Sequence, residues 1–460
     1  MMRDYLKIDA ERLINNEGDM KSFYLETFGC QMNVVDSEQI TALLQGIGYQ
    51  PVDTPDLADL VLLNTCSVRD KAERKVYGHL GRFKPIKDRR PELIIGVGGC
   101  VAQQEGQRML DTVSYLDLVF GTHNIHRLPE MVQQVEQTRQ RASETDFLDR
   151  ETRLNLFPER SASESATRFV TIMQGCDNFC SYCIVPHVRG REISRPSAEI
   201  LNEIEALVAA GVKEVTLLGQ NVNSYGCKND NELSFPQLLE AVDAIPGLDR
   251  LRFATSHPKD ITAELIDCFG RLKSLCPQVH LPVQSGSNRI LTLMNRGYDA
   301  ADYLDKVRRL KAVCPQIRLT TDIIVGFPGE TEEDFEATLD LVERVRYADA
   351  FTFLYSPRVE TAAASMPDNA SARHKQQRFE RLLALQQRIS SEIWQEDAGQ
   401  ILPVLVEGTS KQGDGQLFGR SVWNRIVNFS GPQEMIGRIV PVAINKVLRN
   451  SHLGVYQNNF

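Results

Sequence analysis

The chain has 460 residues, of which 42% are hydrophobic and 25% are charged, as in an ordinary globular protein. This composition excludes a collagen-like or wholly disordered chain, and the length predicts about three domains. No run reaches the roughly 18 apolar residues that span a bilayer, and the N-terminus lacks the apolar core of a signal peptide. We therefore expect a cytoplasmic protein without a membrane partner. The net charge of -9 argues, at face value, against a nucleic-acid partner.

The first part, residues 21–137, alternates short apolar runs with amphipathic segments. The runs are FYLETFG (23–29), LVLLNT (60–65) and LIIGVGG (93–99), and an amphipathic segment at 37–48 separates the first two. Runs of this length indicate buried strands, and alternation with helices predicts an α/β domain with a doubly wound parallel sheet. Residues 138–167 are rich in Ser, Thr, Glu and Arg, and we expect them to form a linker.

The second part, residues 168–397, repeats a strand and a helix about six times. Strands are predicted near Phe169, Glu214, Leu251, Val279, Arg318 and Ala350, and amphipathic helices at 196–211, 260–272, 301–313 and 331–345. Six such units predict an open (βα)6-type barrel with its chemistry at the C-terminal ends of the strands. A long helix at 371–396 follows.

The third part, residues 398–460, contains four short β-rich runs separated by glycines. They are LPVLVEG (402–408), GRSVWNRIVNF (419–429), GRIVPVAI (437–444) and HLGVYQ (452–457). This pattern predicts a small β-barrel of the oligonucleotide-binding type.

Three of the ten cysteines form the pattern C-x3-C-x2-C, at Cys176, Cys180 and Cys183, after the predicted strand FVTIMQG. The cytosol keeps thiols reduced, so metal ligation explains such a group better than disulfides. A four-iron cluster takes one Cys per iron, so three cysteines leave one iron open for a substrate or cofactor. The alternative is a zinc site with a distant fourth ligand, for which His187 is the nearest candidate.

A second set, Cys30, Cys66 and Cys100, is spaced by 36 and 34 residues, and each member ends a predicted strand. Parallel strands end at one edge of the sheet, where ligands of such folds bind. We therefore expect these thiols to converge and to hold a second cluster with one open iron. The alternative is three unrelated buried thiols. The remaining cysteines, Cys227, Cys268, Cys276 and Cys314, form no ligand pattern and are interpreted as structural thiols.

The C-x3-C-x2-C pattern after the first strand of a (βα) barrel, with the aromatic Tyr182 before the last Cys, resembles the radical S-adenosylmethionine enzymes. With a second three-cysteine set, the chain resembles the methylthiotransferases of that superfamily from about Lys21 to Tyr456. Its motifs TFGCQMN, NTCSVR and GGCVAQ match the N-terminal signature of that family, and its last part resembles the RNA-binding TRAM domain.

Longer stretches resemble the branch of the family that acts on N6-isopentenyladenosine beside the anticodon of tRNA. They are CSYCIVPHVRGREISRPS (180–197), LLGQNVNSYG (217–226), HLPVQSGSNRILTLMNRGY (280–298), TDIIVGFPGETEEDF (321–335) and FLYSPRVETAA (353–363). The resemblance implies insertion of a methylthio group at C2 of the adenine. It implies two [4Fe-4S] clusters as cofactors, and two S-adenosylmethionine molecules, one as methyl donor and one as radical source. The six cysteines would be the catalytic and metal-binding residues.

The resemblance also implies partners. They are tRNA through its anticodon loop, an electron donor such as flavodoxin, and proteins that deliver iron–sulfur clusters or sulfur; we expect a monomer. Two alternatives keep the family and change the substrate, to threonylcarbamoyladenosine in tRNA or to an aspartate of a ribosomal protein. A third alternative, a non-catalytic iron–sulfur protein that binds RNA or carries electrons, would need four cysteines per cluster.

Further S-adenosylmethionine contacts are expected at other strand ends. By resemblance these contacts are Tyr182, the sequence Gly219, Gln220, Asn221, and the pair Gly326 and Phe327. The sequence at 219–221 departs from the Gly-Gly-Glu of many radical enzymes. The resemblance places Gly326 and Phe327 near the adenine of S-adenosylmethionine. Gln284, Ser285 and Ser287 are candidate polar groups of the pocket, and His257 and Asp322 also lie at strand ends. For each of these alone a structural hydrogen bond is the competing interpretation. For the Gly326 segment that interpretation is a tight turn with Thr331 as a helix N-cap.

Two segments carry the positive charge that RNA binding needs. Residues 69–90 have nine Lys or Arg against three acidic residues, and residues 401–460 have six against three. The expected RNA contacts are Arg69, Arg74, Lys75, Arg82 and Lys84, Arg189 and Arg191 beside the central cysteines, and Arg420, Trp423 and Arg425 in the last part. The alternative for 69–90 is a solvated helix face.

Overall fold

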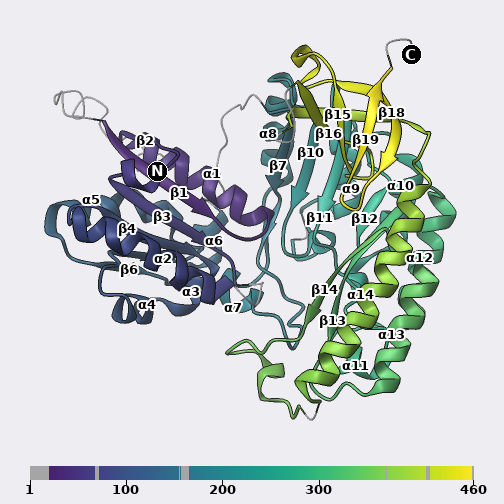
Figure 1. The fold of residues 1–460 in the computed structure, drawn as a ribbon, viewed down its shortest axis with the longest axis horizontal. Helices are drawn as coiled ribbons and strands as arrows, with labels where there is room; N and C mark the ends of the chain where they lie inside the picture. The colour runs from purple at the N-terminus through teal and green to yellow at the C-terminus, as the bar shows by residue number, and fades with distance from the viewer. Residues whose placement is uncertain are drawn as a thin grey trace. The chain divides into compact units, whose positions relative to one another are not determined.

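The structure is a computed structural model and describes residues 20–67, 72–154, 156, 165–229, 231–368, 370–410 and 415–457 (Figure 1). The chain divides into two compact units, Met1–Asp146 and Phe147–Phe460. The division falls inside the segment that we expected to be a linker. Among the described residues, no helix combines the length and the apolar character needed to cross a bilayer.

The first unit is a six-stranded, fully parallel sheet with the strand order β2-β1-β3-β4-β5-β6. The predicted strands are confirmed by β1 (Lys21–Thr27), β3 (Leu60–Thr65) and β4 (Ile94–Gly99). Three short strands were not foreseen, because three residues give no readable apolar run: β2 (Tyr49–Pro51), β5 (Leu118–Phe120) and β6 (Ala142–Glu144). The last of these lies in the segment expected to be a linker, yet it pairs with β5.

Helices cover both faces of this sheet, which confirms the doubly wound prediction. In β3, Val61 and Leu63 pack against one face, and Leu60 and Leu62 against the other, following the period of two of a strand. The first face is covered by α2 (Ala72–Arg89), α3 (Cys100–Glu105) and α4 (Gln107–Thr112), and the second by α1 (Gln31–Gly46) and α5 (Leu128–Thr138).

The second unit contains the predicted open barrel of six parallel strands. Two three-stranded sheets, β11-β10-β7 and β12-β13-β14, are linked by a bridge between Leu251 and Leu275. The strands are β7 (Thr167–Thr171), β10 (Glu214–Leu218), β11 (Arg250–Ala254), β12 (Gln278–His280), β13 (Arg318–Val325) and β14 (Asp349–Leu354). All six predicted strand positions are confirmed.

Helices pack on the outside of this barrel, and their apolar faces bury one continuous core with the strands. They are α8 (Ser197–Ala209), α9 (Phe235–Asp243), α10 (Ala263–Arg271), α12 (Ala300–Val313), α13 (Glu332–Val345) and the long α14 (Ala372–Gln395). Figure 1 shows α12, α13 and α14 next to one another along the barrel, and α13 contacts both of its neighbours. This arrangement leaves the carboxyl ends of the strands available for a site.

The C-terminal residues form a closed five-stranded barrel with the order β15-β16-β17-β19-β18, as predicted. Its strands are β15 (Ile401–Thr409), β16 (Gln416–Arg420), β17 (Ile426–Ser430), β18 (Ile439–Val447) and β19 (Ser451–Tyr456).

A cluster of charged and aromatic side chains around Arg318, called here the Arg318 joint, connects this small barrel to the larger one. The guanidinium of Arg318 lies between the rings of Trp394 and Trp423, 4.5 and 3.9 Å from their centroids. It donates to both carboxylate oxygens of Asp397, at 2.9 and 2.6 Å. His452 Nε2 lies 2.9 Å from the same carboxylate, so strand β19 is part of the joint. Stacking and two-pronged pairing of this kind favour arginine over lysine.

Candidate functional site

The N-terminal cysteines follow three neighbouring strands of the first sheet. Cys30 comes three residues after β1, Cys66 directly follows β3, and Cys100 directly follows β4. Register places Thr27 beside Asn64 and Thr65 beside Gly99 at these carboxyl ends. Cys66 and Cys100 are buried and Cys30 is half-buried. The predicted gathering of strand ends is present in the structure.

Two buried asparagines connect the segment that contains Cys30 with the segment that contains Cys66 by hydrogen bonds. The side chain of Asn33 donates to Asn64 Oδ1 at 3.2 Å and to the Thr65 carbonyl at 3.1 Å. In return Asn64 Nδ2 donates to the Asn33 carbonyl at 2.9 Å. Both residues were missed as site residues by the sequence analysis, although each lies inside a quoted cysteine motif. Their role is to fix the position of Cys30 relative to Cys66.

The backbone around these cysteines is too close for larger side chains. A Cβ on Gly29 would lie 2.3 Å from the Cβ of Cys66, and one on Gly99 would lie 2.4 Å from the Thr65 carbonyl oxygen. Both glycines have positive φ, which favours glycine. Ser67, next to Cys66, has a buried Oγ without a hydrogen-bond partner among the described residues. Three soft sulfur ligands beside an unsatisfied polar atom fit an iron–sulfur cluster.

The central cysteines lie on a loop between two short paired strands and a helix turn. Strand β8 (Met173–Gln174) pairs with β9 (Ile193–Ser194), and α7 (Val185–Arg189) follows the last cysteine. The amide of Cys176 donates to the Gly190 carbonyl at 3.3 Å, and that of Cys183 to the Cys180 carbonyl at 2.9 Å. These hydrogen bonds hold the backbone of the loop that carries the three cysteines.

Burial makes these thiols poor free nucleophiles. Burial, with a smaller contribution from the neighbouring Cys180, raises the pKa of Cys176 to about 11 and that of Cys183 to about 12. Catalytic cysteines have lowered pKa values, whereas a coordinated metal deprotonates its thiol ligands. No three His, Cys, Asp or Glu side chains in the described part of the chain are arranged to hold a single metal ion, as zinc requires. A four-iron cluster has a different requirement, because it binds each cysteine through a separate iron.

Unsatisfied polar atoms gather where β7, β10 and β11 end, beside the cysteine loop. Within the described ranges, buried atoms without a hydrogen-bond partner include Thr171 Oγ1, Glu192 Oε1, Gln220 Nε2, Asn221 Oδ1 and Ser256 Oγ. Buried polar atoms are normally paired, so this group fits a polar ligand such as S-adenosylmethionine. Gln220 and Asn221 were predicted for this role, whereas Thr171, Glu192 and Ser256 were not.

Several of the predicted cofactor contacts also interact with other residues of the protein. Gln220 Oε1 accepts from the Gly175 amide at 2.5 Å, and Asn221 donates to Asp260 at 2.7 Å. A Cβ on Gly219 would meet the side chain of Met173 at 2.3 Å. Gln284 has a φ of +69° and bridges to Ile323, while Asp322 lies 3.5 Å from the ring of His280. These contacts position the strand ends, and for Gln284 and Asp322 they agree with the structural interpretation.

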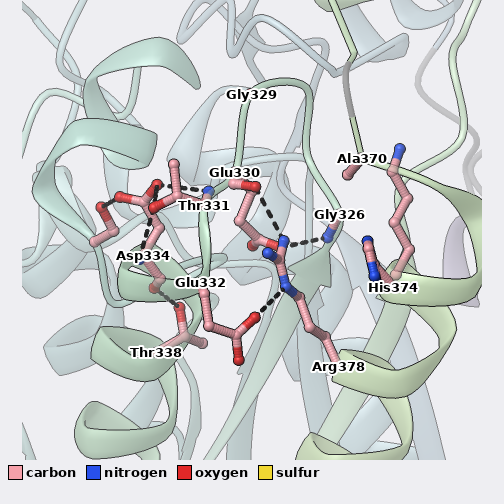
Figure 2. A network of polar contacts seen from close by, with 12 residues as sticks. Gly326, Gly329, Glu330, Thr331, Glu332, Asp334, Thr338, Ala370, His374 and Arg378 are labelled. Carbon is pink, nitrogen blue, oxygen red and sulfur yellow. Dashed lines mark hydrogen bonds and ion pairs between the residues drawn. The ribbon is translucent and has the colours of Figure 1, made fainter.

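The segment after β13 forms a tight turn into α13, and Thr331 is the helix N-cap (Figure 2). Its Oγ1 accepts from the Asp334 amide at 3.3 Å, which confirms the predicted cap. Phe327 is fully buried and belongs to a small core near Tyr182. Gly326 has a φ of +73°, and its amide donates to Glu330 Oε2 at 2.8 Å. The side chain of Glu330, at the end of the turn, thus stabilises the turn by accepting a hydrogen bond from its first residue, Gly326.

Glu330 is a buried carboxyl group, and Arg378 Nη1, from α14, donates to its Oε2 at 3.3 Å. Figure 2 shows this contact. Burial raises the pKa of Glu330 to about 7, in spite of its bonds from Gly326 and Arg378. The folded state then keeps a proton that the unfolded chain releases near pH 4.5. This contribution to stability is complete below pH 4.5 and is lost as the pH rises to about 7.

We therefore expect the free energy of unfolding to fall by about 3 kcal/mol across this pH window because of Glu330. Glu330→Gln removes the titrating group, so its urea unfolding midpoint is expected to change less between about pH 5 and 8 than that of the unaltered chain. Glu332→Gln is the matched control, since Glu332 accepts from the same arginine at 2.9 Å but has a lowered pKa. Equal pH slopes for the Glu330 variant and the unaltered chain contradict this prediction.

Two residues that the sequence analysis did not assign to the cluster contact Cys180. Arg296 Nη1 lies 3.2 Å from its Sγ, and His257 Nε2 lies 3.8 Å from the same atom. Burial, together with Arg296, Lys259 and Lys306, lowers the pKa of His257 to about 2, so the ring is neutral. The motif that contains Arg296 was noted only for its resemblance, and no local pattern links it to a cysteine 116 residues earlier.

The expected RNA contacts of the first unit lie on α2 where they are described. Arg69 and the side chain of Arg74 lie outside the described residues. Lys75 is exposed, Arg82 lies 4.0 Å from Glu26, and Lys84 pairs with Asp88 at 2.6 Å. The exposed fractions of Arg82 and Lys84 are 57% and 52%, so both remain accessible to a phosphate.

In the second unit the expected RNA contacts differ in exposure. Arg191 is exposed, pairs with Asp177 at 2.6 Å and lies over the Phe179 ring, and Arg420 pairs with Glu407 at 3.1 Å. Arg189 and Arg425 are buried. Arg425 donates to the carbonyls of Leu448 and Arg449, and Trp423 stacks on Arg318. A buried guanidinium presents no donor to a phosphate in solvent, so charge counting overstated the exposed basic surface here.

The four cysteines interpreted as structural lie apart from these sites in the sequence and differ in exposure. Cys268, Cys276 and Cys314 are buried, and Cys227 is exposed. Burial in the core is the ordinary environment of an unreactive thiol, and it raises the pKa of Cys268 and Cys276 to about 11. The structural interpretation therefore suits the first three.

Comparison with known families gives one match for each part of the chain. Residues 22–121 match the family described as Uncharacterized protein family UPF0004, residues 170–342 match the Radical SAM superfamily, and residues 395–455 match the TRAM domain. The cysteine loop at the mouth of an open parallel barrel, with the second match, defines a radical S-adenosylmethionine protein. An iron–sulfur cluster and S-adenosylmethionine are its cofactors.

Relatives cover nearly the whole chain. A tRNA-2-methylthio-N(6)-dimethylallyladenosine synthase of Syntrophotalea carbinolica is 62% identical over 435 residues, 95% of this chain and 99% of the relative. The synthase of the same name from Geobacter sulfurreducens is 59% identical over 94% of this chain and 97% of the relative. The chain therefore belongs to the tRNA-2-methylthio-N(6)-dimethylallyladenosine synthase family.

Solved structures support the fold. The radical S-adenosylmethionine methyltransferase TsrM from Kitasatospora setae aligns with a TM-score of 0.56 and 16% identity, over 85% of this chain and 78% of that one. The cobalamin-dependent radical enzyme OxsB aligns with a TM-score of 0.51 and 12% identity, over 83% and 57%. At these identities the similarity concerns the fold alone.

Proposed function

We propose that this chain inserts a methylthio group at C2 of N6-isopentenyladenosine next to the anticodon of tRNA. The observation that carries this proposal is the identity of 62% to a synthase named for this modification, over almost the full length of both chains. Two sets of three cysteines, one following three parallel strands and one on a single loop after β8, would supply the chemistry that such an insertion needs. The aromatic C–H bond of the adenine is inert to acid–base chemistry, so a radical route is required.

We assign one [4Fe-4S] cluster to each cysteine set. Cys176, Cys180 and Cys183 would hold the cluster that works with S-adenosylmethionine, and Cys30, Cys66 and Cys100 the auxiliary cluster. When bound, the first would supply the electron that cleaves S-adenosylmethionine to a 5′-deoxyadenosyl radical, and the second the sulfur that is transferred.

The chain's own residues would bind and orient the reactants. The polar atoms of Thr171, Gln220, Asn221 and Ser256 are available to a polar cofactor where β7, β10 and β11 end. The Asn33–Asn64 pair fixes two ligands of the auxiliary cluster relative to each other. Tyr182 is half-buried between two cysteine ligands and packs against the core that contains Phe327, which holds this part of the loop.

For tRNA we propose that exposed cations on α2 and beside the cysteine loop contact phosphates, with the C-terminal barrel as a further RNA-binding element. Lys75, Arg82, Lys84, Arg191 and Arg420 remain the proposed contacts. Phosphate contacts of this kind give salt-dependent affinity without sequence preference. The target base would leave its stack, which costs little in a single-stranded loop. We further propose a flavodoxin-type electron donor, cluster- and sulfur-delivery proteins as partners, and a monomeric enzyme.

The proposed function is tested by nucleoside analysis of tRNA from a strain that lacks this protein. We expect the methylthio group to disappear from isopentenylated adenosine and to persist on threonylcarbamoyladenosine. Return of the modification with the intact chain, but not with a Cys176→Ala chain, connects the loss to this site. Persistence of methylthiolated isopentenyladenosine in the deletion strain contradicts the proposal, and loss from threonylcarbamoyladenosine supports the alternative substrate.

A further inference from the structure

Arg296 occupies a turn that directs its side chain into the protein. It follows α11 (Asn288–Leu293), and its neighbours Asn295 and Gly297 have φ values of +56° and +68°. Asn and Gly are the residues that adopt this left-handed conformation most readily. The side chain of Asn295 also donates to the Phe179 carbonyl at 3.0 Å, which ties the turn to the cysteine loop. Arg296 itself is only 4% exposed.

The guanidinium of Arg296 is paired without a carboxylate. Nη1 lies 3.2 Å from Cys180 Sγ, Nη2 donates to the Pro282 carbonyl at 2.8 Å, and Nε donates to Tyr298 Oη at 3.1 Å. Among the described residues, none of its hydrogen bonds goes to an acidic side chain. A buried positive charge is costly unless an anion accompanies it. The sulfur of Cys180, which contacts this guanidinium, would become anionic on binding iron and would then accompany the positive charge of Arg296.

His257 provides a second donor to the same sulfur. The amide of Lys259 donates to His257 Nδ1 at 3.2 Å, so Nδ1 carries no proton, and in the neutral ring the proton is on Nε2. Nε2 lies 3.8 Å from Cys180 Sγ. For Cys176 and Cys183 the groups that favour the thiolate include backbone amides, those of Asn178 and Val185 respectively. Cys180 is thus set apart by two side-chain donors, one of them permanently charged.

We infer that Arg296, assisted by His257, raises the reduction potential of the cluster at Cys176, Cys180 and Cys183 by donating hydrogen bonds to Cys180 Sγ. This inference rests on the proposed assignment of that cluster. Reduction adds one electron from a low-potential donor to the iron core, with no bond broken and no proton taken up. Hydrogen bonds to cluster sulfurs and a nearby positive charge favour the more negative, reduced state. Arg296 is therefore a positioning residue that acts through Cys180.

The test uses the full chain with Cys30, Cys66 and Cys100 all changed to Ala, so that one proposed cluster remains. Arg296→Met removes charge and donors, and Arg296→Lys keeps the charge but not the fork of donors. Arg271→Met is the matched control, because Arg271 lies 4.0 Å from the Sγ of Cys268, a thiol outside both sets. After anaerobic reconstitution, iron content and the fraction of reduced cluster at fixed solution potentials are measured, the latter by electron paramagnetic resonance.

We expect Arg296→Met to lower the ratio of reduced to oxidised cluster about tenfold, a shift of about 59 mV for a one-electron couple. Arg296→Lys is expected to give a smaller fall, and Arg271→Met none. If Arg296→Met does not bind iron, the inference is tested with Arg296→Lys alone. A ratio of reduced to oxidised cluster in Arg296→Lys equal to that of the parent chain then overturns the inference. An unchanged ratio in both variants, or loss of iron from both, also overturns it. A parent chain that binds no iron contradicts the proposed function instead.

Discussion

Cys176→Ala is expected to abolish the formation of 5′-deoxyadenosine from S-adenosylmethionine. The substitution removes one of three thiols on a single loop, and two remaining thiols cannot hold a four-iron cluster with one open iron. The measurement is 5′-deoxyadenosine released by reconstituted protein with S-adenosylmethionine and dithionite. The methylthio product should also disappear, because the radical is needed to activate C2 of the adenine.

The matched control for this variant is Cys314→Ala. Cys314 is a buried thiol that directly follows α12 and belongs to neither cysteine set. Its loss should leave 5′-deoxyadenosine formation intact, apart from an effect on stability. If Cys176→Ala still produced 5′-deoxyadenosine at the rate of the unaltered chain, the assignment of this loop to the radical chemistry would be wrong.

Cys66→Ala is expected to separate the two halves of the reaction. Cys66 lies in the first compact unit, and the central cysteine loop lies in the second. Cleavage of S-adenosylmethionine should therefore continue, while methylthiolated tRNA is no longer formed. Both products are measured in one reaction with tRNA, so that 5′-deoxyadenosine serves as the internal control for folding.

The contradicting results for Cys66→Ala are distinct. Methylthiolated product at an undiminished level would remove the sulfur-supplying role from the N-terminal cysteines. Loss of both products together would mean that Cys66 supports the whole protein and not one step. Only retained cleavage with lost methylthiolation supports two separate cysteine sites.

The alignment of the strand ends that precede Cys30, Cys66 and Cys100 was predictable because it follows from topology. Cysteines one βα unit apart, each at the end of an apolar run, end on the same edge of a parallel sheet. The start of α1 was less predictable, because apolar periodicity begins at Ser37. The helix begins at Gln31, since Cys30 serves as its N-cap in a capping box with Asn33. A polar residue three positions after the cysteine was the available signal.

The partners of the cysteines were not predictable, because they come from distant parts of the chain. Asn33 and Asn64 are 31 residues apart, and Arg296 is 116 residues from Cys180. No local period encodes such pairs. Counting Lys and Arg residues overestimated the RNA-binding surface for a related reason, because a count does not distinguish an exposed cation from a buried one. Arg425 and Trp423 contribute to the joint around Arg318, and only tertiary packing shows it.

The net charge of -9 is compatible with RNA binding, because positive charge is concentrated in segments such as 69–90. On α2 the described cations Lys75, Arg82 and Lys84 are exposed, whereas Arg425 in the last part is buried. Local exposed charge, not the total, decides whether a phosphate can be bound.

The central claim, two cysteine sites that each hold a four-iron cluster, is tested most directly by the iron and sulfide content of anaerobically reconstituted protein. We predict about eight irons and about eight sulfides per chain, four of each for each cluster. Changing either set of three cysteines to Ala should reduce both values by half, and changing all six should remove them. About four irons in the unaltered chain, or no loss from one of the triple variants, would contradict the account.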